Sequence, residues 1–221
     1  MPDAISLDLM IFDVEHYLKS RQGCIDIQKK IENDPLIYPA TVLMALAPSF
    51  ASHCIAPYGN YVCQKLLGHV SDLQLLRILE MLDVDMLPIA TNIHGACFLK
   101  CLIQELAGRA EQSLLLNLFA RSLLSIIPCL VNDPHGALVI QHFFTFISAS
   151  AVHDPIVEYI RNNFTSIVTD RYGCCLVKKV LESKTGKSLS EDVMQHVLVL
   201  IKVSSRSNSI NQRFRIDMVT M

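Results

Sequence analysis

The segment PYGNYVCQKLLG, residues 57–68, determines how the rest of the chain is read, because degraded copies of it recur along the sequence. The other copies are RQGCIDIQKKIE from Arg21, NIHGACFLKCLI from Asn92, DPHGALVIQHFF from Asp133 and DRYGCCLVKKVL from Asp170. Their glycines are 36, 36, 41 and 37 residues apart and are Gly23, Gly59, Gly95, Gly136 and Gly173. A period of this length is typical of a solenoid of stacked helical units.

Each glycine is followed by about ten residues of apolar periodicity, so it is expected to open a helix. A second, amphipathic helix follows each time, with Ser71 as one predicted N-cap, Asp154 as another before Pro155 at the first helical position, and Ser190 as a third. Short apolar pieces such as MLPIAT lead into the next glycine. These patterns predict an all-α solenoid of about five three-helix repeats.

The predicted repeat domain spans residues 1–202. Its units cover about 8–35, 36–71, 72–108, 109–149 and 150–202. The remaining residues, 203–221, are rich in Ser and Asn and lack the repeat, so a disordered tail is expected there. Because a sixth glycine-led helix should begin at this place, we also expect a truncated array.

Composition narrows the class of protein further. Hydrophobic residues make up 51% of the chain, yet the longest apolar region, 114–131, is broken by Asn117, Arg121 and Pro128, which argues against a membrane span. The first residues lack a basic region and place Asp3, Asp8 and Asp13 where a signal peptide has apolar residues, so no signal peptide is expected. The eight cysteines fit a reducing compartment as small buried hydrophobes. A cytoplasmic protein is expected, with the nucleus or nucleolus as alternatives.

Three positions of each glycine-led helix stand out, namely those one, two and five residues after the glycine (+1, +2 and +5). Polar or small residues occupy +1 and +5 although most neighbours are apolar, and +1 and +5 share a helix face with +2 beside them. The rows are Cys24, Ile25, Gln28; Asn60, Tyr61, Gln64; Ala96, Cys97, Lys100; Ala137, Leu138, Gln141; and Cys174, Cys175, Lys178. We expect these residues to face a ligand along an exposed inner surface.

This pattern resembles the Pumilio (PUF) family of RNA-binding repeat proteins over roughly residues 8–202, and YGNYVCQKLL is the best-matching stretch. The resemblance implies a right-handed superhelix that binds single-stranded RNA, each unit reading one base with +1 and +5 on the base edge and +2 stacking. It implies uracil for unit two, through Asn60, Tyr61 and Gln64, and adenine for unit one, hence a site that ends in 5′-UA-3′. It further implies a monomer without cofactor or metal that regulates messenger RNA through its 3′-untranslated region and recruits protein partners on the convex face.

The charge of the glycine-led helices supports this interpretation. The formal net charge of the chain is only −2. The eight residues that follow each of the five glycines contain six lysines in total and one acidic residue, Asp26, so these five segments together carry a charge of +5. The lysines are Lys29, Lys30, Lys65, Lys100, Lys178 and Lys179. Positive charge is therefore concentrated on the helices proposed to face RNA.

Other kinds of site are weaker. His94, Cys97 and Cys101 have zinc-like spacing, but Gly95 interrupts them and no CxxC pair exists, so packing is the favoured role. No catalytic motif occurs, which predicts a protein that is not an enzyme. Two rivals stay open: a protein-interaction scaffold like armadillo and HEAT stacks, and RNA binding without sequence readout, as in PUF-like factors of ribosome assembly. The weak stacking residues of units three to five favour either rival.

Overall fold

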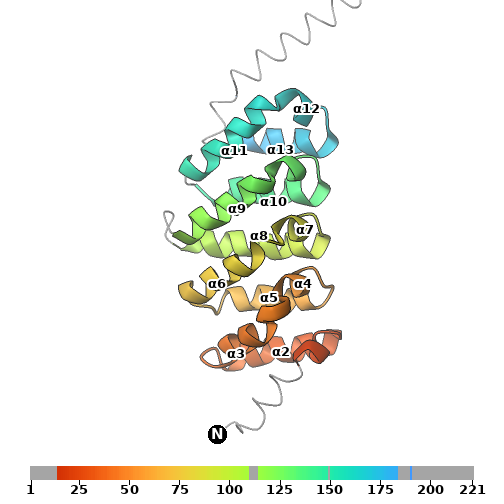
Figure 1. The fold of residues 1–221 in the computed structure, drawn as a ribbon, viewed down its shortest axis with the longest axis vertical. Coiled ribbons are helices and arrows are strands. Elements are labelled where there is room, and N and C mark those ends of the chain that lie inside the picture. Colours follow the sequence, from red (N-terminus) through yellow and green to blue (C-terminus); the bar gives the residue numbers. More distant parts are fainter. Residues whose placement is uncertain (1–13, 110–113, 149, 184–189, 191–221) are drawn as a thin grey trace, which may run out of the picture.

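A computed structural model describes residues 14–109, 114–148, 150–183 and 190. Within these ranges the chain forms helices and no strands. Figure 1 shows the helical units stacked in chain order along the long axis of the molecule. No single helix in these ranges is long and apolar enough to cross a bilayer, and only a bent pair, Tyr38–Cys54 with Gly59–Leu67, reaches that length and composition together. The predicted all-α solenoid is confirmed.

One layer of the stack consists of the glycine-led helices, each of which packs beside the next. All five repeated glycines lie at the beginning of these helices, as the sequence predicts. The layer comprises α2 (Arg21–Asn33), α5 (Gly59–Leu67), α8 (Ile93–Gly108), α10 (Pro134–Phe146) and α13 (Arg171–Glu182).

The other helices form an opposite layer and its connections to the first. The longer ones are α3 (Tyr38–Leu46), α6 (Asp72–Leu82), α9 (Leu114–Leu130) and α11 (Ser150–Asn162). The connecting pieces are η1 (Ala47–Ser49), α4 (Phe50–Cys54), α7 (Met86–Ala90) and α12 (Phe164–Val168). An aromatic contact links units two and three, because the ring of Phe50 in α4 packs edge to face on that of Phe98 in α8, with ring centroids 5.9 Å apart.

Polar side chains cap five of the described helices. Ser71 caps α6 in a full capping box with Gln74, as predicted. Four glycine-led helices begin with a cap three residues before the glycine, and its side-chain oxygen accepts from the N–H of the glycine itself. These caps are Ser20, Asn92, Asp133 and Asp170.

The glycines are required because two backbones approach closely. None has a positive φ angle, so left-handed backbone geometry is not the reason. A Cβ added at Gly95 would lie 2.2 Å from the carbonyl oxygen of Ile89, and one at Gly173 would lie 2.2 Å from that of Ile167. In all five units the nearest atom belongs to the residue six positions earlier, at or just before the turn into the helix. A side chain at the glycine would therefore separate the glycine-led helix from the piece before it.

Unit four departs from the predicted three pieces, because α9 runs without a break from Leu114 to Leu130. Ten residues before the glycine, units two, three and five have Ser49, Asp85 and Asn163, and each is the N-cap of the short helix, with backbone angles outside the α-helical region. Unit four has Ile126 at that position. A half-buried Ile continues the apolar stripe where a polar residue would end it, so two pieces merge into one helix.

The predicted start of the last outer helix is also wrong. Pro155 lies inside α11, which begins at Ser150 and not after an Asp154 cap. Val152 and His153 are buried one turn before the proline, so burial of this earlier turn extends the helix toward its N-terminus. Ser190 is described alone, and the predicted helix after it and the predicted tail lie outside the described residues.

Replacing Gly95 with Ala should destabilise the protein by at least about 1–3 kcal/mol, because the new methyl group would overlap the Ile89 carbonyl. The measurement is urea unfolding followed by circular dichroism. Gly108→Ala, at the end of the same helix, is the matched control: its Cβ would meet nothing within 4 Å, so unfolding should be unchanged or slightly harder. Equal stability of the two variants would contradict the close-approach role.

Candidate nucleic-acid interface

The +2 residues project from the glycine-led layer. Tyr61 is 55% exposed and Leu138 is 49% exposed. Cys175 is also exposed, whereas Ile25 and Cys97 are half-buried. Because the five helices pack side by side, these residues form a row across the layer, one from each unit. We call this row, together with the +5 residues, the glycine-led face.

The +5 residues border the row. Gln28, Gln64, Lys100 and Gln141 are half-buried, and Lys178 is exposed. Gln28 is turned partly inward, since its Nε2 donates to the Cys24 carbonyl at 3.1 Å. Amides and ammonium groups in such positions offer hydrogen bonds to a ligand that lies along the row.

The +1 residues are not on this face, and the prediction that they are exposed is wrong for four units. Cys24, Asn60, Ala96 and Ala137 are at most 3% exposed, and Cys174 alone is open. Successive residues of a helix are turned by about 100°, so +1 turns inward when +2 points outward. Within the described residues no glycine-led helix follows α13, which leaves Cys174 uncovered.

Asn60 illustrates the difference. Its Nδ2 donates to the carbonyl oxygens of Ala56 at 2.7 Å and Pro57 at 3.0 Å. Ala56 occupies the position three residues before the glycine, where the other units have a capping side chain. Asn60 therefore stabilises the turn of unit two from a position inside the helix, and its amide nitrogen is engaged in hydrogen bonds within the protein.

A second row of rings lies next to the first, immediately before the glycines. Tyr58 is 41% and Tyr172 is 37% exposed, and His94 and His135 are half-buried. The sequence pattern places these residues in turns, but each lies three residues before a +2 residue and so belongs to the same side of the helix. The signal that could have identified them is a ring before the glycine in four of the five copies.

The same geometry explains the zinc-like spacing in α8. His94, Cys97 and Cys101 occupy positions −1, +2 and +6, which in α5 are Tyr58, Tyr61 and Lys65. The alignment is thus a property of the repeat. No group of three or more His, Cys, Asp or Glu among the described residues is arranged to hold a metal ion.

The lysines of the glycine-led helices differ in whether their charge already contacts another side chain. Lys65 pairs with Glu32 of α2, which lowers the pKa of that carboxyl group by a hydrogen bond and by charge. Lys179 pairs with Glu182 at 3.7 Å, and Lys30 lies over the Tyr38 ring. Lys29 and Lys178 are exposed. The positive charge available to an anionic ligand is accordingly smaller than the sequence count indicates.

Comparison with known proteins finds similarity to one family of repeat proteins. The model of the Pumilio-family RNA-binding repeat matches residues 54–82 and 129–160. These two segments of the chain match Pumilio-family repeats. The CPL (NUC119) domain model matches residues 149–217, a range that includes most of the predicted tail, 203–221.

Two fungal proteins are similar to this chain in sequence. A Pumilio domain-containing protein of Schizosaccharomyces pombe is 26% identical over 89% of the chain and 29% of its own length. Suppressor protein MPT5 of Saccharomyces cerevisiae is 28% identical over 82% of the chain and 22% of its own length. The chain therefore spans less than a third of these two relatives.

Solved structures share the fold. The Puf4 RNA-binding domain bound to the HO endonuclease RNA 3′ UTR recognition sequence superposes with a TM-score of 0.75 and 22% identity, over 84% of this chain and 55% of that one. The RNA-binding domain of yeast Puf5p bound to SMX2 RNA gives 0.72 and 22%, over 84% and 53%.

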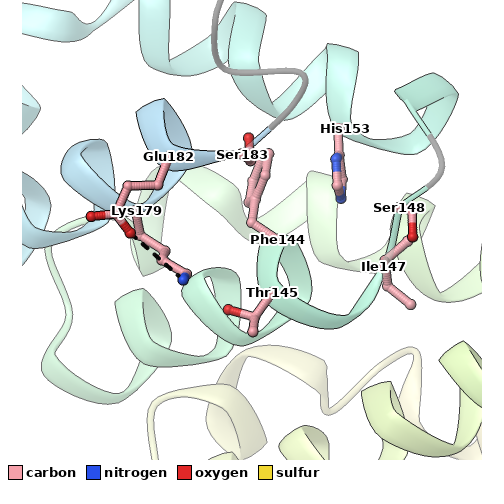
Figure 2. A pocket seen from close by; sticks show the side chains of 8 residues that line it. All are labelled: Phe144, Thr145, Ile147, Ser148, His153, Lys179, Glu182 and Ser183. Atoms are coloured by element: carbon pink, nitrogen blue, oxygen red, sulfur yellow. Dashed lines mark ion pairs between the residues drawn. The ribbon is translucent and has the colours of Figure 1, made fainter.

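A pocket of about 290 Å³ lies between the ends of α10 and α13 and the start of α11. Figure 2 shows the Lys179–Glu182 ion pair at one end and His153 at the other. His153 stacks on Phe144 at 4.3 Å, and burial lowers its pKa to about 4. The imidazole is neutral at pH 7, so the pocket carries no net charge to attract nucleic acid.

His153 should make stability depend on pH. Its pKa falls from 6.5 to about 4 on folding, so the unfolded chain binds a proton between these values that the folded chain does not. The folded state consequently loses stability as pH falls from 6.5 to 4. His153→Leu should flatten the decrease of the thermal midpoint over this range, whereas His16→Leu, at an exposed position, should not. Identical slopes for wild type and His153→Leu would contradict this assignment.

Proposed function

We propose that the glycine-led face binds single-stranded RNA with base selectivity and that the protein regulates messenger RNA in this way. The observation that carries the proposal is the row of +2 residues, one per unit, with the Tyr61 ring 55% exposed between half-buried hydrogen-bonding groups. An exposed ring can stack on any base, and a carboxamide beside it can bond to the base edge. The Pumilio-family match and the RNA-bound Puf4 and Puf5p domains of the same fold support the proposal.

Further details belong to the same proposal. The protein acts by binding and not by catalysis, in the cytoplasm, on 3′-untranslated regions of messages. Unit two reads uracil and unit one reads adenine, so that short RNAs ending in 5′-UA-3′ are the first ligands to test. Protein partners bind the opposite layer.

RNA binding without base readout is the second candidate, and the +2 row supplies the observation that favours it. Ile25, Cys97, Leu138 and Cys175 offer poorer stacking surfaces than Tyr61, and Lys100 and Lys178 contact phosphate more readily than a base edge. Fluorescence anisotropy with a 5′-UA-3′ RNA and its scrambled counterpart separates the candidates. A preference for the first RNA supports base readout, and equal, salt-sensitive affinities support the second candidate.

Tyr61→Ala should weaken binding of the 5′-UA-3′ RNA by about 1–3 kcal/mol, the contribution of one stacked base. Tyr61→Phe keeps the ring and should bind like wild type. Leu73→Ala, at a 68% exposed position of α6 in the opposite layer, controls for loss of exposed apolar surface and should have no effect. Unchanged affinity of Tyr61→Ala would remove Tyr61 from the interface.

Lys178→Ala should reduce the salt dependence of RNA binding. A contact between this exposed lysine and a phosphate releases a counterion, so its loss should decrease the slope of log K against log salt by about 0.7. Titrations at four salt concentrations measure the slope. Arg77→Ala, an exposed position of α6, is the control and should keep the wild-type slope. A wild-type slope for Lys178→Ala would place the RNA backbone elsewhere.

A further inference from the structure

An apolar groove of about 780 Å³ lies in the opposite layer, between α3 and α6. The next outer helices pack closely, α6 on α9 and α9 on α11, whereas α3 and α6 are less closely packed (Figure 1). Met44 on the α3 wall is 77% exposed and Leu73 on the α6 wall is 68% exposed. Large apolar side chains gathered around one groove indicate a surface that another polypeptide covers.

Two charged residues, Arg77 and Glu80, lie on the α6 wall among the apolar ones. Both are exposed, and neither forms an ion pair with another residue of the described ranges. Their charges are therefore available to whatever occupies the groove, one cation and one anion at a spacing of three residues.

The α6 wall has matching side chains at equal distances on both sides of its midpoint, which lies between positions 78 and 79. Each matching pair combines either two apolar residues or two opposite charges. The pairs are Arg77 with Glu80, Leu76 with Met81, and Leu73 with Val84 of the turn after α6. A helix with this arrangement is complementary to a copy of itself that runs in the opposite direction.

A two-fold axis through the midpoint of α6 would bring the members of each pair together across two copies. Arg77 of one copy then faces Glu80 of the other, and the same contact forms a second time by symmetry. Leu76 of one copy packs on Met81 of the other beside these ion pairs. In this arrangement α6 of the second copy lies in the groove, and Met44 of α3 covers its other side.

We propose that the protein forms a two-fold symmetric dimer in which α6 of each copy fills the groove between α3 and α6 of the other. A helix of an unrelated protein would present the two charges in the matching order only by coincidence, whereas a second copy presents them by symmetry. The dimer differs from the monomer that the family resemblance implies. It leaves the glycine-led layer free, so the inference does not rest on the proposed function.

Sedimentation equilibrium of the full chain measures this association directly, because one copy has a mass of 24.7 kDa and the dimer has twice that mass. Wild type should change from the first mass to the second between about 1 and 100 μM, as expected for a modest, partly polar interface. A mass of 24.7 kDa over this whole range would overturn the proposal.

Charge reversal makes the test specific to the α6 contact. Arg77→Glu and Glu80→Arg each replace both ion pairs of the dimer with like charges, so each should weaken association by at least about tenfold. An equal mixture of the two variants should associate again, because the two acidic positions of one variant face the two basic positions of the other. The combined variant Arg77→Glu/Glu80→Arg keeps the wild-type net charge and should also form the dimer.

Arg21→Glu, which reverses an exposed arginine of α2 in the glycine-led layer, is the matched control and should associate like wild type. Circular dichroism establishes that each variant is folded. Wild-type association of either single variant would overturn the proposal, and so would a mixture of the two that stays monomeric. RNA is absent from all these measurements, so their outcome is separate from that of the RNA-binding experiments.

Discussion

The contact between each repeated glycine and the residue six positions before it is the constraint on which the stack depends. At Gly23, Gly95 and Gly173 a Cβ would lie 2.2 Å from a carbonyl oxygen of the preceding piece, far inside van der Waals distance. The absence of a side chain lets the chain turn sharply and lets the glycine-led helix begin against the piece before it. Because the contact recurs in each unit, the five helices begin at or two residues before the glycine and pack side by side in one layer.

This placement decides which residues meet solvent. Once the glycine is buried against the preceding turn, the helix has little rotational freedom, and +2 is the position that points outward. The neighbouring +1 position is then buried, as Cys24, Ala96 and Ala137 are. A face with one projecting residue per unit follows from the packing, whatever the side chains at +2 happen to be. Their chemistry, with one tyrosine among aliphatic residues and cysteines, makes unit two the strongest part of the candidate interface.

The interface is also less modular than the repeat suggests. Gln64 is held by Asn60 within its own helix and by Cys101 from the next one, and Lys65 pairs with Glu32 of the previous helix. Side chains at a unit boundary thus serve two neighbouring units. A substitution at position +6 of one unit can change the amide that the preceding unit presents, without contact to any ligand.

Much of this could be predicted from the sequence, because the relevant signals are local. The glycine period, the apolar stripes and caps such as Ser71 depend on residues within a few positions of each other, and they predicted the helices, the solenoid and the exposed Tyr61. Burial of Asn60 and its bonds to Ala56 and Pro57 could not be predicted, since a +1 residue looks equivalent to +5 on a helix face until the next helix is placed beside it. The merged helix of unit four depends on Ile126, which occupies a position where other units have a polar residue.

The sequence by itself determined the repeat and the residue types along the candidate face, since period and helix polarity are properties of neighbouring residues. Only the tertiary structure decided which of those residues are free to meet a ligand. That choice depends on the angle between consecutive helices and on hydrogen bonds between residues as far apart in the chain as Gln64 and Cys101, and such contacts exist only after the units have stacked.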